Sequence, residues 1–318
     1  GQNMTTLTLH MSRCLGKSLK RGDEIVLSRM DHDANVAPWL LLADDLGLVV
    51  RWIDFDTETY EFPDDALTKV LSDKTKLLAM GMASNCTGTV NDTKRFAAEA
   101  KKAGAIVYLD AVQYAPHYAM DVQDLGADFV VSSAYKWFGP HQGILWGREA
   151  LLEAMPPFLG GGNMISDVRL DGFTTAELPA KFEAGTPPIT DVIGLGAAVG
   201  YLEKLGMAQV RKHEIELSTY VLNMLKDRFG DDITIHGPAN PELRGATFSF
   251  AFRDIHPHDL SQVLDQQNVC VRAGHHCAKP LMRILGANAT ARASFYFYNT
   301  MSEADALADA LDSASDIF

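Results

Sequence analysis

The chain has 318 residues, 47% of them hydrophobic, which is enough for a sizeable core and about two domains. Its formal net charge of −13 argues against nucleic acid as a partner, because phosphate binding needs a basic face. No apolar run approaches the roughly 20 residues of a membrane span, and no signal peptide is recognisable after Gly1, so we expect a cytoplasmic protein with no membrane contact.

The first part of the chain alternates between short apolar runs and helical patterns such as 93–104. Several of the runs are continuously apolar and β-branched, and they predict strands at 23–30, 47–55, 75–83, 105–112, 128–134 and 143–147. Continuously apolar strands joined by helices indicate an α/β fold with a mostly parallel sheet that helices cover on both faces.

A glycine-rich stretch from 158 to 188 interrupts this alternation, and its length favours a functional segment. Two helices are predicted after it, at 191–206 and 207–230. Shorter, better alternating elements follow, with strands at 233–237, 247–252, 268–274 and 292–299 and a closing helix at 302–318. We therefore expect a large domain, 1–201, and a smaller C-terminal α/β domain, 202–318.

Chemically useful side chains stand where two neighbouring strands end, and ligands bind at such ends in open α/β sheets. Asp110 ends one apolar run and Gln113 follows it, while the next run ends at Ser133 with Lys136 just beyond. Singly, Asp110 could be a helix cap and Lys136 a surface lysine. Together, with aromatic residues around the lysine, they favour pyridoxal phosphate, which needs an amine for a Schiff base and a carboxylate at its ring nitrogen.

Three weaker signals precede these residues. Thr5 begins an amphipathic run, so it marks either an anion site at a helix N-terminus or a plain cap. His32 follows a strand and could stack on a planar ring or shuttle protons, or it could be satisfied by Asp31 or Asp33. Asn85 ends another strand, as a donor to a ring oxygen or as a turn residue.

The chain has four cysteines with no CxxC pair and no zinc spacing, which indicates reduced thiols and no metal site. Cys277 follows two histidines, and Arg272 and Lys279 add to an electropositive surrounding that favours a thiolate. A zinc site or an inert loop cysteine are the alternatives. Arg292, on a predicted strand, could grip a substrate carboxylate or form a surface ion pair.

With these residues assembled, the chain resembles the class V aminotransferase-fold enzymes over essentially its whole length. Within that group it is most similar to the Suf-type (group II) cysteine desulfurases and selenocysteine lyases. The matching motifs occur in order as MDHDAN, SNCTGT, DAVQ, SSAYK, FEAGTP, RAGHHCA and RASFYFYNT. The resemblance implies the type I fold of pyridoxal-phosphate-dependent transferases.

Carried over by position, the resemblance gives roles to the residues around the cofactor ring. Lys136 would form the Schiff base, Asp110 would pair with the pyridinium nitrogen, and Gln113 would bond the ring hydroxyl oxygen. His32 would stack on the ring, and Asn85 would lie beside the cofactor.

The resemblance also implies how phosphate and substrate are held. Thr5 and Ser133 would hold the phosphate, and Arg292 would bind the amino-acid carboxylate with Arg272 nearby. Thr186 would reach the phosphate of a partner subunit, because the family forms homodimers with shared sites.

The chain departs from the family pattern in three places. Tyr135 stands where the family usually has a histidine at the phosphate site, and its phenol can still donate a hydrogen bond. Asp33 stands where a second histidine is common. The family also has a further N-terminal segment before the position of Gly1, which we expect to be absent from this chain.

These assignments predict an enzyme that converts L-cysteine to L-alanine and takes the sulfur onto Cys277 as a persulfide. A protein or thiol acceptor would then collect the sulfur, as in iron–sulfur cluster assembly. Selenocysteine lyase and cysteine or cystine C–S lyase are the alternatives with the same cofactor. An aminotransferase or epimerase fits less well because transamination needs no thiol, and a scaffold without cofactor remains the alternative outside enzymes.

Overall fold

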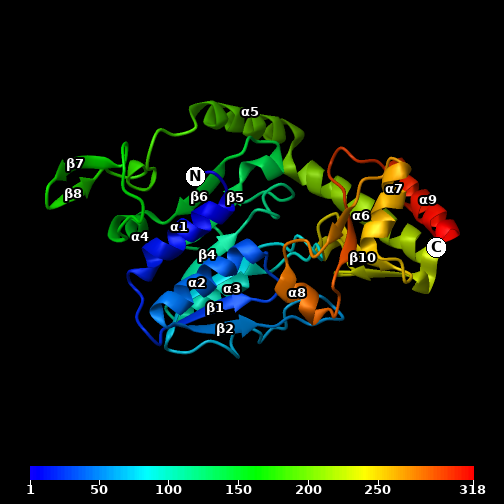
Figure 1. Cartoon of the computed structure of the whole chain (residues 1–318), viewed down its shortest axis with the longest axis horizontal. Helices are drawn as coiled ribbons and strands as arrows, with labels where there is room; N and C mark the ends of the chain where they lie inside the picture. Colours follow the sequence, from blue (N-terminus) through cyan, green and yellow to red (C-terminus); the bar gives the residue numbers. More distant parts are fainter.

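The computed structural model describes residues 1–318 as two α/β parts joined by long helices (Figure 1). The N-terminal part contains a six-stranded sheet with the order β2-β1-β3-β4-β5-β6. Its strands are β1 (Glu24–Ser28), β2 (Val49–Ile53), β3 (Thr75–Gly81), β4 (Ile106–Asp110), β5 (Phe129–Ser133) and β6 (Gly143–Gly147). Neighbouring strands pair in parallel except β5 and β6, which are antiparallel. The predicted mostly parallel sheet is confirmed.

Helices pack on both faces of this sheet, which explains why its inner strands are continuously apolar. The helices of this part are α1 (Met4–Gly16), α2 (Ala37–Leu46), α3 (Thr93–Lys102) and the short α4 (Glu149–Ala154). Side chains alternate along β1, so that Ile25 and Leu27 pack with α1 and α2 while Val26 packs with α3. Trp39 of α2 is completely buried on the first face.

The glycine-rich stretch contains an antiparallel hairpin, β7 (Ile165–Arg169) and β8 (Gly172–Thr175), which projects away from the sheet (Figure 1). The sequence did not predict this hairpin, because its strands are largely exposed and lack the apolar alternation of a half-buried strand. The helices α5 (Ile189–Leu205) and α6 (Met207–Phe229) follow and meet at Gly206. The boundary expected after residue 201 falls inside α5.

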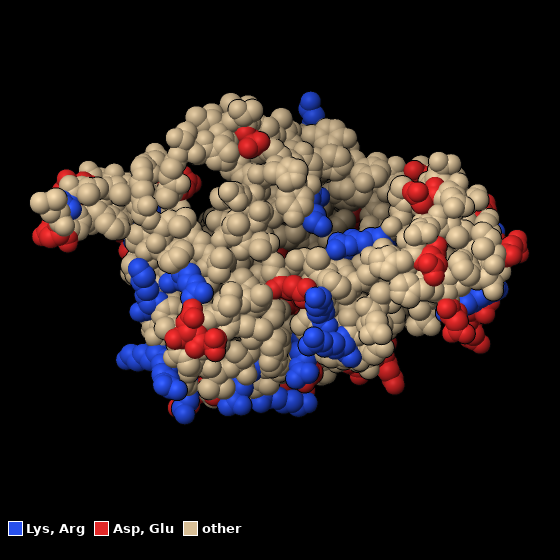
Figure 2. Space-filling model, viewed as in Figure 1, with Lys and Arg blue, Asp and Glu red and all other residues tan.

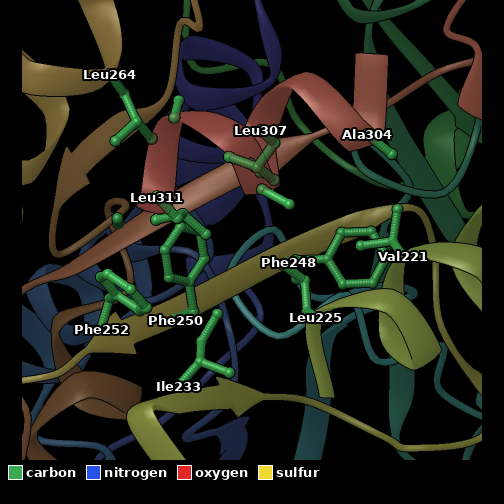
Figure 3. Close-up of a cluster of buried hydrophobic side chains, with 14 of the residues drawn as sticks. Val221, Leu225, Ile233, Phe248, Phe250, Phe252, Leu264, Ala304, Leu307 and Leu311 are labelled. Atoms are coloured by element: carbon green, nitrogen blue, oxygen red, sulfur yellow. The ribbon is translucent and has the colours of Figure 1, made fainter. Parts of the chain in front are cut away.

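The C-terminal part has a four-stranded antiparallel sheet with the order β11-β12-β10-β9. Its elements are β9 (Ile233–His236), β10 (Thr247–Phe252), α7 (Pro257–Gln266), β11 (Arg272–Gly274), α8 (Lys279–Ile284), β12 (Thr290–Ser294) and α9 (Met301–Ile317). Figure 3 shows alternate phenylalanines of β10, with Phe250 lying near Leu307 and Leu311 of α9 in one buried cluster. The strand predicted at 268–274 is present but shorter, and the one predicted at 292–299 begins two residues earlier and already ends at Ser294.

The short helix α8 connects the two parts, because it belongs to the C-terminal segment yet packs against the N-terminal sheet (Figure 1). Leu281 and Met282 share a buried cluster with Met30, Phe55 and Cys86. The loop before α8 is thus held at the edge where the parallel strands end. None of the helices combines the length and the apolar character that crossing a membrane needs.

Candidate active site

A pocket opens at the carboxyl ends of β1, β3, β4 and β5, where ligands bind in open α/β sheets. The first turn of α1 and the loop between β11 and α8 complete its wall. All but two of the predicted site residues line it, namely Thr5, His32, Asn85, Asp110, Gln113, Ser133, Tyr135, Lys136, Arg272 and Cys277. Tertiary structure therefore brings together residues from both ends of the chain.

The carboxylate and the amine predicted at the strand ends face one pocket and perturb each other. Asp110 ends β4, is 7% exposed and accepts a hydrogen bond from the Val112 N–H at 2.8 Å. Burial raises the pKa of Asp110 to about 6, although the nearby Lys136 lowers it. Burial also lowers the pKa of Lys136, and the charges of Arg292 and Arg272 lower it further. This makes Lys136 a better nucleophile than an ordinary lysine.

The start of α1 forms one end of the pocket. The Met4 N–H donates to the Ser133 Oγ at 2.8 Å, and Thr5 lies beside it in the pocket wall. Asn3 caps the helix by accepting the Thr6 N–H at 3.0 Å. Gly143 of β6 allows this approach, since a Cβ there would lie 2.7 Å from a backbone atom of Asn3. The Met4 and Thr6 N–H groups are thus engaged, and the Thr5 N–H and the hydroxyls of Thr5 and Ser133 remain to donate to an anion such as phosphate.

His32 lies in the wall without a hydrogen bond to either neighbouring aspartate. Its Nδ1 accepts the Ala34 N–H at 3.0 Å, so the neutral ring carries its proton on Nε2. Burial lowers the pKa of His32, which favours that neutral form. The alternative of a histidine satisfied by Asp31 or Asp33 is therefore wrong.

Sequence reasoning missed Asp31 as a pocket residue. Its carboxylate accepts the Asn35 amide at 2.7 Å and the Gly81 N–H at 2.9 Å. Burial raises the pKa of Asp31 to about 7, and the charge of Asp110 adds to that effect. An aspartate directly after a strand in the MDHDAN motif was the signal that could have identified it.

Cys277 is partly exposed and lies in the loop between β11 and α8. The Arg272 Nη2 donates to its Sγ at 3.2 Å. His276 turns away and contacts the Thr290 Oγ1 at 2.8 Å, and burial lowers its pKa to about 3. No group of three or more histidine, cysteine or acidic side chains is arranged to hold a metal ion.

The two predicted residues outside the pocket wall have different surroundings. Arg292 of β12 lies opposite Arg272 of β11, and its Nη1 donates to the Asn85 carbonyl at 2.7 Å. Arg292 therefore lies outside the pocket wall and contacts the wall residue Asn85. Thr186 is exposed just before α5, on a surface that this chain does not cover. Their proposed contacts stay predictions.

The sequence profile described as Aminotransferase class-V matches residues 3–307. The chain belongs to the class-V aminotransferase family. A Streptomyces coelicolor protein named "Probable cysteine desulfurase" is 45% identical over 296 residues, which are 93% of this chain and 70% of that protein.

Solved structures of two cysteine desulfurases are similar to this chain over nearly its whole length. The cysteine desulfurase CsdA from Escherichia coli superposes with a TM-score of 0.92 at 35% identity, covering 100% of this chain and 78% of that one. The apo cysteine desulfurase from Thermococcus onnurineus NA1 gives 0.93 at 34% identity, with 99% and 78% covered. The predicted fold class is confirmed.

Class-V aminotransferases use pyridoxal phosphate, and the donor set of this pocket fits that cofactor. Lys136 offers an amine of lowered pKa to the aldehyde. Asp110 is a buried carboxylate that accepts one hydrogen bond. Burial raises its pKa because its negative charge is poorly compensated, and a protonated ring nitrogen would provide the compensating positive charge. Ser133 and the start of α1 offer donors to the phosphate.

Proposed function

We propose that this chain is a pyridoxal-phosphate-dependent cysteine desulfurase that keeps the sulfur of L-cysteine on Cys277. One observation carries the assignment, namely that Cys277, with a guanidinium N–H on its sulfur, lines the same pocket as Lys136. The closely related cysteine desulfurases support the same reaction. An aminotransferase would have no use for a thiol at that position.

Bound pyridoxal phosphate would supply an electron sink that weakens the Cα–H bond of an amino acid. Lys136 takes up the Cα proton, since burial and two arginines favour its neutral amine. The negative charge of Asp110 would stabilise a protonated ring nitrogen. Gln113, which also lines the pocket, would bond the ring oxygen.

The remaining wall residues orient the two ends of the ligand. Thr5, Ser133 and the α1 N-terminus receive the phosphate, with the Tyr135 phenol as a further donor in place of a histidine. His32, whose Nδ1 is held by the Ala34 N–H, would stack on the ring and could donate from its Nε2. The substrate carboxylate would be received by the guanidinium of Arg292 with that of Arg272, which lines the pocket and lies opposite Arg292 on the neighbouring strand.

The sulfur transfer is balanced without an external oxidant. The Cys277 thiolate attacks the sulfur of bound L-cysteine, and an S–S bond forms as the Cβ–S bond of the substrate breaks. The electron pair of the broken bond passes to Cβ, which a proton then converts to the methyl group of alanine. L-cysteine and the Cys277 thiol thus become L-alanine and a Cys277 persulfide, which a second thiol or an acceptor protein must discharge.

A second copy of this chain completes the site in this proposal. Several large apolar side chains of α5 are exposed, including Ile193 at 71%, and so is Thr186 just before this helix. Figure 2 shows few charged side chains over α5, as expected for a surface that a partner covers. We infer that Thr186 reaches the phosphate end of the partner's pocket in a homodimer.

The test is incubation with L-cysteine and a reducing thiol while alanine and sulfide are measured together. Cys277→Ala should lower both by on the order of 10²-fold, since no other thiol lines the pocket. Cys270→Ala, which removes an exposed cysteine outside the pocket, should keep the wild-type rate. Full alanine formation by Cys277→Ala would refute the role of Cys277, and pyruvate as the product would indicate a C–S lyase.

A further inference from the structure

Two loops of the N-terminal sheet hold the loop that carries Cys277. The Asp33 N–H donates to the Cys277 carbonyl at 2.7 Å, and the Asp33 Oδ1 accepts the Lys279 N–H at 3.0 Å. The Asn85 amide donates to the His276 carbonyl at 2.5 Å. Asp33 follows β1 and Asn85 follows β3, so both contacts join the carboxyl edge of the sheet to the C-terminal part.

The loop has a reason to need this support. His276 has φ 53° and Cys277 has φ 56°, so two consecutive residues with side chains adopt the left-handed region. That conformation is unfavourable for residues other than glycine and persists only where surrounding contacts enforce it. Ala278, which precedes α8, gives that helix no side-chain cap, so the Lys279 N–H relies on the carboxylate of Asp33.

We propose that Asp33 is a positioning residue for Cys277, and the proposal rests on the sulfur-accepting role of Cys277. Asp33 contacts the backbone directly after the Cys277 side chain at two points, with its own N–H at the Cys277 carbonyl and with its carboxylate at the Lys279 N–H. These contacts keep the loop in its left-handed conformation, with the Cys277 Sγ against Arg272 and inside the pocket wall. Asp33 acts through the loop and does not contact the sulfur.

The variants Asp33→Ala and Asp33→Asn separate this role from an effect of charge. Both keep the backbone N–H, but alanine loses the acceptor for the Lys279 N–H, whereas the asparagine side-chain oxygen retains it without the negative charge. Asp33→Ser, whose hydroxyl is too short to reach, serves as a second loss variant if alanine does not fold. Asp121→Ala is the matched control, because this exposed carboxylate likewise accepts one backbone N–H, from Gln123 at 2.9 Å.

The first measurement needs no turnover. The cofactor-loaded variants are treated with iodoacetamide, and labelling of Cys277 relative to the exposed Cys270 is followed by peptide mass spectrometry. The ratio should rise severalfold in Asp33→Ala as the loop leaves the wall, and it should match the wild type in Asp33→Asn and Asp121→Ala. An unchanged ratio in Asp33→Ala, or an equal rise in Asp33→Asn, would overturn the proposal.

The second measurement is alanine formation from L-cysteine. In Asp33→Ala, kcat should fall about tenfold or more while KM changes little, because a displaced nucleophile affects the transfer step rather than substrate binding. Asp33→Asn should recover most of kcat. A wild-type kcat in Asp33→Ala would refute the positioning role, even if the labelling of Cys277 increased. A failure of the desulfurase assignment would be distinguishable, because Cys277→Ala would then keep full activity while Asp33→Ala would still show increased labelling of Cys277.

Discussion

Two buried carboxylates in one pocket are the least ordinary residues of this chain. Burial raises the pKa of Asp31 to about 7 and that of Asp110 to about 6. At neutral pH Asp31 is therefore partly protonated, whereas Asp110 is mostly charged and available to a cationic ring nitrogen. Burial thus favours the protonated form of both carboxylates, and more so for Asp31, to which the charge of Asp110 adds.

This difference predicts a pH-dependent stability of the cofactor-free protein. The folded pKa of Asp31, about 7, lies above the unfolded value of about 3.9, so its contribution is fully present below pH 4 and is lost as pH rises through 7. Relative to Asp31→Asn, the wild type should lose at most about 1.4 kcal/mol of unfolding free energy per pH unit in this window.

Urea unfolding of both proteins at pH 5, 6, 7 and 8 checks this prediction. Asp110 is present in both proteins, so its own titration largely cancels in the difference. Loss of one acceptor for Asn35 or Gly81 shifts the difference by a constant and does not change its slope. A flat or opposite pH dependence would mean that Asp31 titrates as an ordinary surface carboxylate.

At the scale of elements, the phosphate end depends on how closely α1 approaches β6. Gly143 donates its N–H to the Gly1 carbonyl at 2.7 Å, and a Cβ at this position would meet the backbone of Asn3. Backbone atoms cannot move aside as a flexible side chain can. The position of the start of α1, and with it the hydrogen bond from the Met4 N–H to Ser133, therefore depends on the lack of a Cβ at Gly143.

We predict that Gly143→Ala weakens binding of pyridoxal phosphate by about tenfold or more, because displacing the helix N-terminus by a fraction of an ångström misaligns its donors. Titration of the cofactor-free protein, followed by the absorbance of bound pyridoxal phosphate, measures this. Gly160→Ala is the matched control, since a Cβ there meets nothing nearer than 3.7 Å. Equal affinities of the two variants would show that α1 does not position the phosphate.

At the scale of the whole molecule, several of the exposed apolar side chains belong to the segment that holds the β7–β8 hairpin and α5. Ile189, Val192 and Ile193 lie exposed on α5, and Leu170 and Phe173 lie exposed on the β7–β8 hairpin. These residues and Thr186 belong to a segment whose hairpin projects from the N-terminal part and whose helix α5 leads toward the C-terminal part (Figure 1). A surface of this kind is what a second copy would bury.

Ile193→Glu should convert a dimer into a monomer, because a charge at the centre of an apolar interface is left unpaired. Sedimentation velocity measures the change, and Leu41→Glu is the control, since it places the same charge at an exposed leucine of α2. A monomeric wild type would contradict the proposed homodimer.

Mixed dimers test the shared site directly. Lys136→Ala and Thr186→Ala should each be impaired alone, whereas dimers formed from both regain one pocket with a native Lys136 and a native Thr186. Reconstitution after mixing should therefore restore activity above that of either variant. If the mixture only averages the two activities, Thr186 serves its own chain.

The sequence by itself determined the parallel sheet and most of the pocket, because both follow from local patterns. Continuously apolar strands predict a sheet covered on both faces, and parallel strands place their carboxyl ends at one edge, so Asp110, Ser133 and Lys136 were predictable neighbours. The exposed hairpin was not predictable, because no burial imposes a pattern on its strands.

Only the tertiary structure decided which polar atoms meet across the two parts. Asp33 and Lys279 are 246 residues apart, and their hydrogen bond exists because α8 packs back onto the N-terminal sheet. The burial that raises the pKa of Asp31 likewise depends on what surrounds the strand end. The local sequence encodes the hydrophobic periodicity of each helix and strand. Contacts between the two parts depend instead on how the surfaces of the folded elements fit together, and no single segment of the sequence contains that information.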